Sequence, residues 1–167
     1  AKRRVITMNV NVLRSESTGS IHIKSANPEE APAIRFNFLS TQHDRDGLLA
    51  AIRKGRELMA ISPLKEMTGA EIAPGAHIQS DADLLEWVRN TAETTYHPVG
   101  TCKMGQDPMA VVDAELRVHG MEGLRVADAS IMPTLTSGNT NAPCIMIGEK
   151  CAEMVLRAVE TERRKAA

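Results

Sequence analysis

The first forty residues alternate between apolar and polar side chains. This two-residue period, typical of a half-buried β-strand, occurs over 5–13 (VITMNVNVL), 21–25 (IHIKS) and 34–38. The Ser, Thr and Gly content of 14–20 predicts a turn, so the first two segments are expected to pair as a hairpin. The third segment extends the prediction to an antiparallel sheet with one solvent-facing side.

The period changes to that of a helix at Asp44. Over 44–62 the apolar positions recur at helical spacing, with acidic residues first and basic residues later. Ser80 is a suitable N-cap for a second helix, which begins with acidic residues and carries an apolar stripe at Leu84, Leu85 and Val88. The intervening stretch is interrupted by prolines and glycines, which predicts irregular structure there.

The last third of the chain combines short strand-like pieces with one long helix. The pieces are 110–113, 116–120 and 124–128, and a loop follows them. Pro143 marks the region where the helix is expected to start, because a proline suits the first helical turn. The chain as a whole is therefore predicted to be α+β, with an antiparallel or mixed sheet covered by helices.

Charge and composition exclude several classes of function. Lys and Arg number 20 against 21 Asp and Glu, a net charge of −1, which argues against a nucleic-acid-binding protein. No apolar run approaches the ~20 residues that span a bilayer. The three cysteines are too few, and odd in number, for a disulfide framework, and the N-terminus lacks the apolar core of a signal peptide. We therefore expect a cytoplasmic protein with no membrane span.

The stretch TTYHPVGTCKMG, residues 94–105, holds the first candidate for chemistry, His97. Metal binding is disfavoured, because His97 to Cys102 and Cys144 to Cys151 are not recurrent ligand spacings. A nucleophilic Cys102 paired with His97 has no supporting feature in the sequence. An imidazole, with an unperturbed pKa of about 6.5, suits general base catalysis. From these residues alone, His97 remains either a structural residue or an acid/base catalyst.

Two motifs in order carry a resemblance to a known family. YHPVGTCKMG is followed, about forty residues later, by SGNTNAPCIMIGEKCA, and residues 95–156 together resemble the C-terminal signature of the glucose–methanol–choline (GMC) flavin oxidoreductases. The similarity points to the choline-dehydrogenase-like branch, whose members oxidise alcohols. The earlier sheet and helices agree with the substrate domain of that family. The final strand, loop and helix would then complete an α/β domain that binds FAD.

The resemblance implies roles for individual residues. His97 would be the catalytic acid/base, and Asn139 the second polar catalytic residue, with Asn141 as the alternative two positions later. Tyr96 would lie beside the isoalloxazine, although a packing role is equally compatible with its position. The cofactor-binding residues implied by the resemblance also include Asp128, Ala129, Asn141 and Ala142. The cofactor would be FAD, the substrate a small-molecule alcohol, and no metal is expected.

One feature of the family is absent from the sequence. The Gly-x-Gly-x-x-Gly fingerprint that binds the ADP part of FAD does not occur in the 167 residues. We therefore expect residues 1–105 to be a portion of the substrate-binding domain, and 106–167 to return to an FAD-binding domain whose N-terminal part is missing here. An aromatic content of 2% also suggests part of something larger.

The missing fingerprint bears on the expected activity. The chain would be the C-terminal part of an FAD-dependent alcohol oxidase or dehydrogenase, inactive when isolated, with the N-terminal FAD-binding portion as its partner. Two alternatives stay open at this point. One is a non-catalytic fragment that packs without binding flavin, and the other is a lyase on the same flavin scaffold.

Overall fold

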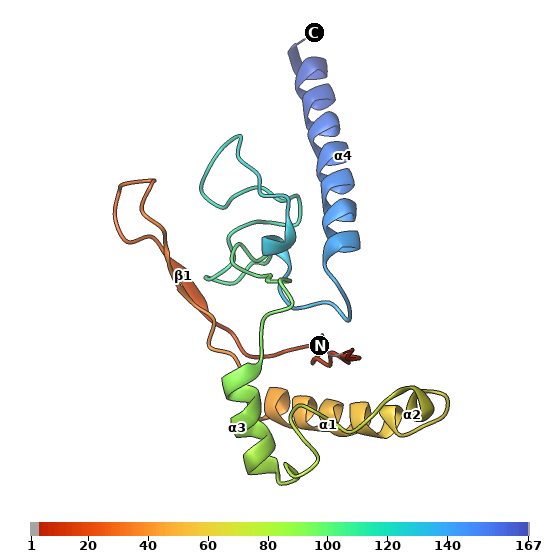
Figure 1. The fold of residues 1–167 in the computed structure, drawn as a ribbon. Helices are drawn as coiled ribbons and strands as arrows, with labels where there is room; N and C mark the ends of the chain where they lie inside the picture. The colour runs from red at the N-terminus through yellow and green to blue at the C-terminus, as the bar shows by residue number, and fades with distance from the viewer. Residues whose placement is uncertain (1–3, 167) are drawn as a thin grey trace. The chain divides into compact units, whose positions relative to one another are not determined.

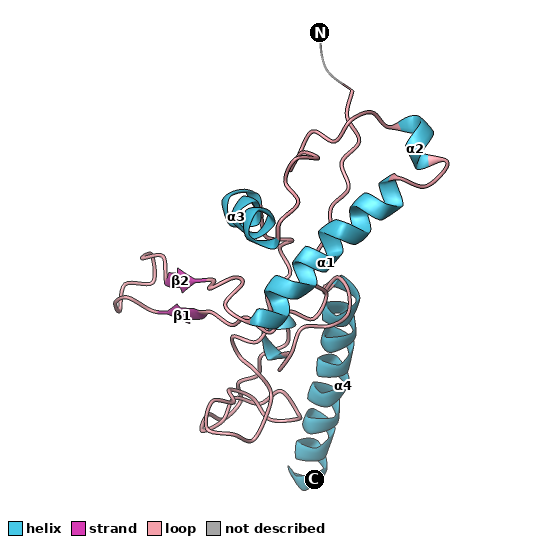
Figure 2. Ribbon diagram, turned by 90° about the horizontal axis from the view of Figure 1, so that it is seen from below, coloured by secondary structure: helices cyan, strands magenta, loops and turns pink. Residues whose placement is uncertain are grey.

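The computed structural model describes residues 4–166. Two short strands and a series of helices follow one another in the order β1 (Ser20–His22), β2 (Ala33–Arg35), α1 (Gln42–Met59), α2 (Leu64–Met67), α3 (Asp81–Thr91), the 3-10 helix η1 (Ala129–Ile131) and α4 (Asn141–Ala166). Figure 2 shows how much of the remaining chain is loop. The chain divides into two compact units. The first contains the described residues through Gly19 with Arg35–Thr94, and the second contains Ser20–Ile34 with the described residues from Thr95.

The first unit is built on the packing of α1 against α3. Its core consists of Leu49 and Ile52 from α1 and Leu84 and Val88 from α3, and all four side chains are buried. Ser80 caps α3 as predicted, with its hydroxyl accepting a hydrogen bond from the Asp83 amide at 3.1 Å. The helical periods in the sequence therefore identified both elements, although α1 begins two residues before Asp44 and α2 interrupts the stretch predicted to be irregular.

The segment 5–13 was wrongly predicted to be a strand. It is extended along α1 without pairing with another strand. Side chains at alternate positions face the helix, because a Cβ added at Gly47 would meet Val12 at 3.1 Å and one at Gly55 would meet Met8 at 3.3 Å and Val10 at 3.4 Å. The alternation thus correctly indicated a segment with one side facing a packing partner, but that partner is a helix and not a strand.

The sheet is correspondingly smaller than expected. It has two strands, β1 and β2, so the partner of the 21–25 region is the segment around 34 and not 5–13. All six strand residues are exposed. Just beyond β2, the rings of Phe36 and Phe38 stack on each other with centroids 5.1 Å apart, and both rings are exposed. The predicted α+β class is confirmed, with helices dominating it.

A buried carboxylate ties the N-terminal segment to α1. Asp44, which is 2% exposed, accepts hydrogen bonds from the Ser15 hydroxyl at 2.6 Å and from the amides of Glu16 at 2.9 Å and Ser17 at 2.8 Å. Burial alone would raise the pKa of Asp44, but these hydrogen bonds outweigh it and hold that pKa well below its ordinary range. The carboxylate therefore stays charged and fixes the 15–17 segment at the start of the helix.

The second unit consists mainly of loops packed against the first half of α4. Its core contains Val112, Leu116, Ile131, Met132 and Ile147. The strand-like pieces predicted between 110 and 128 meet only through isolated bridges, Val112 with Val118 and Arg117 with Arg125. In Figure 1 the far end of α4 extends beyond these loops, and every described residue from Val155 onward is exposed.

The compact units do not divide the chain at the expected boundary of residue 105. The boundary between the two compact units lies between Thr94 and Thr95, and Ser20–Ile34 belongs to the second unit. The assignment of 1–105 and 106–167 to two domains of a larger enzyme therefore stays a prediction. Within residues 4–166, no helix is both long and apolar enough to cross a bilayer.

Candidate functional site

His97 and Thr140 form the contact that joins the two sequence motifs. The imidazole Nδ1 lies 2.9 Å from the Thr140 hydroxyl oxygen and 3.4 Å from the Thr140 amide nitrogen. Thr140 is 7% exposed, whereas His97 is half-buried. Nδ1 is thus the ring nitrogen engaged with the described residues, which leaves Nε2 as the nitrogen available to a bound molecule.

Main-chain hydrogen bonds hold the first motif in place. The Cys102 amide donates to the Ser130 carbonyl at 3.0 Å, and the Met104 amide donates to the Ile131 carbonyl at 2.8 Å. Val99 and Met104 pack against the core of the second unit. The segment that follows His97 is therefore anchored on η1 at two points, which restricts the movement of the histidine.

The path of the main chain after His97 requires a glycine at position 100. Its φ of +88° lies in the left-handed region, where a side chain is strained. A Cβ at this position would also lie 3.3 Å from the Met132 carbonyl oxygen. The close approach at Gly100 is therefore made to the protein's own main chain.

Thr140 was missed by the sequence analysis. Its carbonyl accepts the first helical hydrogen bond, from Cys144 at 3.0 Å, which places Thr140 at the N-cap of α4. A cap hydroxyl usually accepts from the amide of the second or third helical residue, but Pro143 in the third position has no N–H. The pair Thr140 and Pro143 was the available signal, because it indicated a cap hydroxyl free for another partner.

The residues beside Thr140 surround the start of α4. Asn139, Asn141 and Ala142 are all exposed, and Asn139 directly precedes the residue that contacts His97. The helix begins at Asn141, two residues before the proline near which it was expected. The structure therefore places both candidate asparagines within one residue of the His97 contact.

The remaining predicted residues lie on the same unit. Tyr96 is 78% exposed and has a φ of +61°, an uncommon conformation for a residue with a bulky side chain. Asp128 caps η1, its carboxylate accepting from the Ser130 amide at 2.7 Å, and Ala129 packs against the core. Because Ser130 also accepts from Cys102, the 128–130 turn lies beside the first motif.

The three cysteines are free and partly buried. Cys151 packs against the core of the second unit, as a small apolar side chain would. Within residues 4–166, no group of three or more His, Cys, Asp or Glu side chains is arranged to hold a metal ion. Nδ1 of His97 contacts Thr140, so the ring does not use this nitrogen to activate Cys102.

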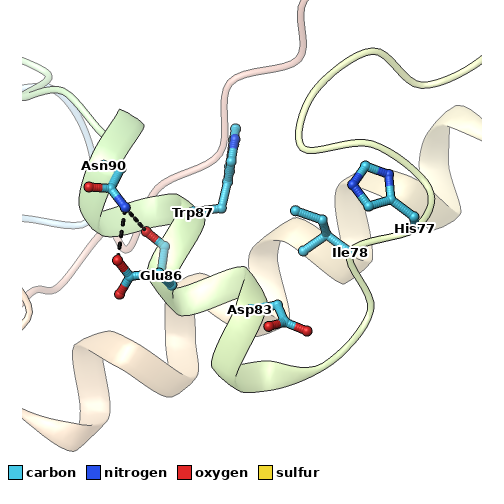
Figure 3. Close-up of a pocket in the computed structure, with 6 residues that line it drawn as sticks. All are labelled: His77, Ile78, Asp83, Glu86, Trp87 and Asn90. Atoms are coloured by element: carbon cyan, nitrogen blue, oxygen red, sulfur yellow. Dashed lines mark hydrogen bonds between the residues drawn. The ribbon is translucent and has the colours of Figure 1, made fainter.

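A surface pocket of about 520 Å³ lies elsewhere, in the first unit (Figure 3). Trp87 and Ile78 provide apolar surface, and three of the polar residues at its edge already have partners. Asn90 donates to the Glu86 carboxylate at 3.0 Å, and Asp83 accepts from the Ser80 hydroxyl at 2.6 Å. This pocket contains none of the residues that the sequence assigned to chemistry.

Comparison with known proteins places the chain in a family. The family model described as GMC oxidoreductase matches residues 15–148. A protein of Escherichia coli named oxygen-dependent choline dehydrogenase is 55% identical over 147 residues, which are 88% of this chain and 26% of the relative. A protein of the same name from Klebsiella pneumoniae is 54% identical over the same shares. The chain thus spans about a quarter of the length of these relatives.

Solved structures agree with this assignment. Pyridoxine 4-oxidase from Mesorbium loti has a TM-score of 0.80 and 35% identity, covering 84% of this chain and 28% of that one. A fungal aryl-alcohol oxidase has a TM-score of 0.77 and 33% identity, and the match covers 85% of this chain and 24% of the oxidase. Formate oxidase of Aspergillus oryzae, studied for modification of its FAD, has a TM-score of 0.80 and 30% identity. The match covers 86% of this chain and 25% of the oxidase. The chain belongs to the GMC oxidoreductase family.

Proposed function

We propose that this chain is the C-terminal part of an FAD-dependent enzyme that oxidises an alcohol to a carbonyl compound. The observation that carries the proposal is the contact between His97 and Thr140. It joins a histidine in the first motif to the start of α4 in the second, 43 positions later. The proposed base therefore contacts a residue that is flanked in the sequence by two exposed asparagines, Asn139 and Asn141.

The residues at the start of α4 are compatible with a bound flavin. The first residues of a helix have main-chain N–H groups without acceptors inside the helix, and here Asn141 and Ala142 are exposed. The 26-residue helix adds partial positive charge at this end. Such donors suit the carbonyl oxygens of the flavin pyrimidine ring and negative charge on the reduced ring. Tyr96, Asp128 and Ala129 are further proposed contacts.

His97 supplies the proton chemistry in this proposal. Its Nε2 accepts the proton of the substrate hydroxyl group, while the side-chain amide of Asn139 donates a hydrogen bond to the same oxygen. The resulting imidazolium and the amide together stabilise the charge that builds on that oxygen. FAD, when bound, supplies the acceptor for the hydride that leaves the carbon, so the two electrons and one hydrogen leave as the hydride and the second hydrogen leaves as the proton taken up by His97.

The N-terminal FAD-binding portion is the proposed partner of this chain. On α4, Ile145, Leu156 and Val159 are 61%, 65% and 45% exposed. At 100° per residue they fall within an arc of about 60°, on the side of the helix opposite Ile147 and Met154, which face the core. An apolar stripe of this kind is suited to burial against another part of the enzyme. Isolated, the chain is expected to be inactive.

The test uses a protein in which this chain follows an N-terminal FAD-binding portion, called here the assembled enzyme. The matching region of the Escherichia coli relative can be replaced by this chain to obtain it. Purified protein should be yellow, and mixing it with alcohols under anaerobic conditions should bleach the flavin. A panel that includes choline, benzylic and short primary alcohols would identify the substrate class. Bound flavin that no alcohol bleaches would contradict the proposal and favour a lyase.

A further inference from the structure

We propose that Thr140 is a positioning residue whose hydroxyl holds the imidazole ring of His97 in one direction both before and after the ring takes up a proton. This inference rests on the proposed function, in which Nε2 receives the proton of the alcohol. It concerns the direction of the ring and assigns no tautomer to the resting enzyme. Thr140 acts through His97 and does not touch the substrate.

A hydroxyl group is suited to a partner whose protonation changes. The Thr140 oxygen, 2.9 Å from Nδ1, accepts a hydrogen bond when Nδ1 carries a proton, and the hydroxyl donates one when Nδ1 carries the lone pair. The Thr140 amide nitrogen, 3.4 Å from Nδ1, can only donate, so it serves the second case alone. The hydroxyl is therefore the group of Thr140 that stays bonded to Nδ1 in every form of the ring.

The difference between these two groups matters during proton transfer. A neutral ring that accepts the alcohol proton has its lone pair on Nε2 and its own proton on Nδ1. Once the proton has been taken up, both ring nitrogens carry protons. In both forms Nδ1 is a donor, so an amide alone would have no hydrogen bond to the ring, whereas the Thr140 hydroxyl oxygen accepts in both. Replacing the hydroxyl by an apolar group therefore frees the ring in the two forms that the reaction uses.

The position of Thr140 makes its hydroxyl a fixed point. The residue is 7% exposed, and its carbonyl accepts from Cys144 at the first turn of α4. A β-branched side chain has few rotamers, and Pro143 removes one of the amides that would otherwise compete for the hydroxyl oxygen. The hydroxyl is thus tied to the helix start and not to a movable loop.

The direction of the ring determines where Nε2 lies. The main chain after His97 is anchored through the amides of Cys102 and Met104, so rotation of the imidazole about its side-chain bonds is the freedom that remains. A contact at Nδ1 removes that freedom and keeps Nε2 pointing to one place. Misplacement of a reacting group by about 1 Å can cost on the order of 10² in rate, so this restraint is expected to be visible in the kinetics.

The test is NMR relaxation of the assembled enzyme labelled with ¹³C at Cε1 of histidine. The His97 signal is identified by its loss in His97→Gln, and its shift shows whether the ring is neutral or protonated. In wild type the order parameter of the Cε1–H bond should stay at roughly 0.8 or above in both forms. Thr140→Val keeps the shape and the amide, and the order parameter should fall below about 0.6, while Thr140→Ser should resemble wild type. A wild-type ring that becomes mobile on protonation overturns the inference, whatever the variants do.

Flavin reduction provides an independent second measurement. In single-turnover experiments Thr140→Val should lower the rate roughly 10- to 100-fold, with the dissociation constant of the alcohol nearly unchanged, and Thr140→Ser should recover most of the rate. Thr134→Val removes the hydroxyl of an exposed threonine in the same loop and should have no effect. Equal loss in Thr140→Val and Thr140→Ser would indicate a purely structural role and overturn the inference. Failure of the proposed function is distinguishable, because His97→Gln would then reduce flavin as fast as wild type while the NMR result stands.

Discussion

His97 Nδ1 lies 2.9 Å from the hydroxyl of Thr140, and the two residues are 43 positions apart in the chain. The contact joins the loop that carries the histidine to the first turn of the longest helix. Because the loop is also bonded to η1 through Cys102 and Met104, the imidazole is held from two sides.

The two asparagines beside Thr140 should differ in their effect on chemistry. In the assembled enzyme, Asn139→Ala should slow flavin reduction by roughly 10- to 100-fold, since one hydrogen bond to the reacting oxygen is lost. Asn141→Ala should have the smaller effect, because Asn141 is assigned to the cofactor through its main chain. Rapid mixing with the substrate alcohol measures both rates. A larger loss in Asn141→Ala would exchange the two assignments.

Gly100 should not tolerate a side chain. Its φ of +88° and the 3.3 Å approach of a Cβ to the Met132 carbonyl predict that Gly100→Ala lowers the free energy of unfolding by about 1–2 kcal/mol. Urea denaturation followed by far-UV circular dichroism measures the change. Gly69→Ala is the matched control, because a Cβ there meets no atom within 4 Å. Equal stability of the two variants would contradict the role given to Gly100.

The Asp44 carboxylate should be the main acid-sensitive contact of the first unit. Asp44→Asn should lower the free energy of unfolding by roughly 1.5–3 kcal/mol, because hydrogen bonds to a charged acceptor are lost. Urea denaturation can be followed through Trp87, the only tryptophan of the chain, which packs against the α1–α3 core. Asp46→Asn, an exposed change two residues further along α1, should have little effect.

The pH dependence of the Asp44 contact follows from the direction in which the pKa of this carboxylate is shifted. The pKa of Asp44 is lower in the folded state than in the unfolded state, so its contribution is present in full above the unfolded pKa of about 3.9. It is lost as the pH falls below that value toward the lower pKa of the folded state. The stability difference between wild type and Asp44→Asn should therefore shrink on acidification. A difference that grows instead would contradict the assignment.

The apolar stripe on α4 should be needed for assembly. Leu156→Lys should weaken the association with a separately expressed N-terminal portion by roughly 30-fold, equivalent to about 2 kcal/mol of lost apolar burial. Glu160→Lys places the same side chain at a neighbouring position that is already charged, and serves as the control. Co-purification and FAD content measure assembly. Equal assembly of the two variants would mean that the stripe faces solvent in the enzyme.

Local signals in the sequence were sufficient for α1, α3 and α4, but not for the short helix α2. Ser80 and the acidic residues after it defined the start of α3, and helical spacing identified α1. The 5–13 segment shows where such signals are insufficient. Alternation indicates that Met8, Val10 and Val12 share one side of the segment, but it does not specify whether a strand or a helix packs against that side.

The site was predictable to a similar degree. His97 was predicted from the motif in which it lies. Asn139 and Asn141 were predicted from their position before the last helix. Thr140 was not predicted, because its importance depends on a contact across 43 positions that no local pattern encodes. Only the proline three residues later indicated that its hydroxyl would be available for such a contact.

The central claim is that His97 removes the proton of the alcohol. The most direct measurement is anaerobic stopped-flow reduction of the flavin in the assembled enzyme, comparing wild type, His97→Gln and His43→Gln. His43 is exposed on α1 in the first unit and serves as the control for changing a histidine. His97→Gln should bind FAD normally but reduce it roughly 10²- to 10⁴-fold more slowly, with His43→Gln unchanged. Reduction by His97→Gln at the wild-type rate would contradict the account.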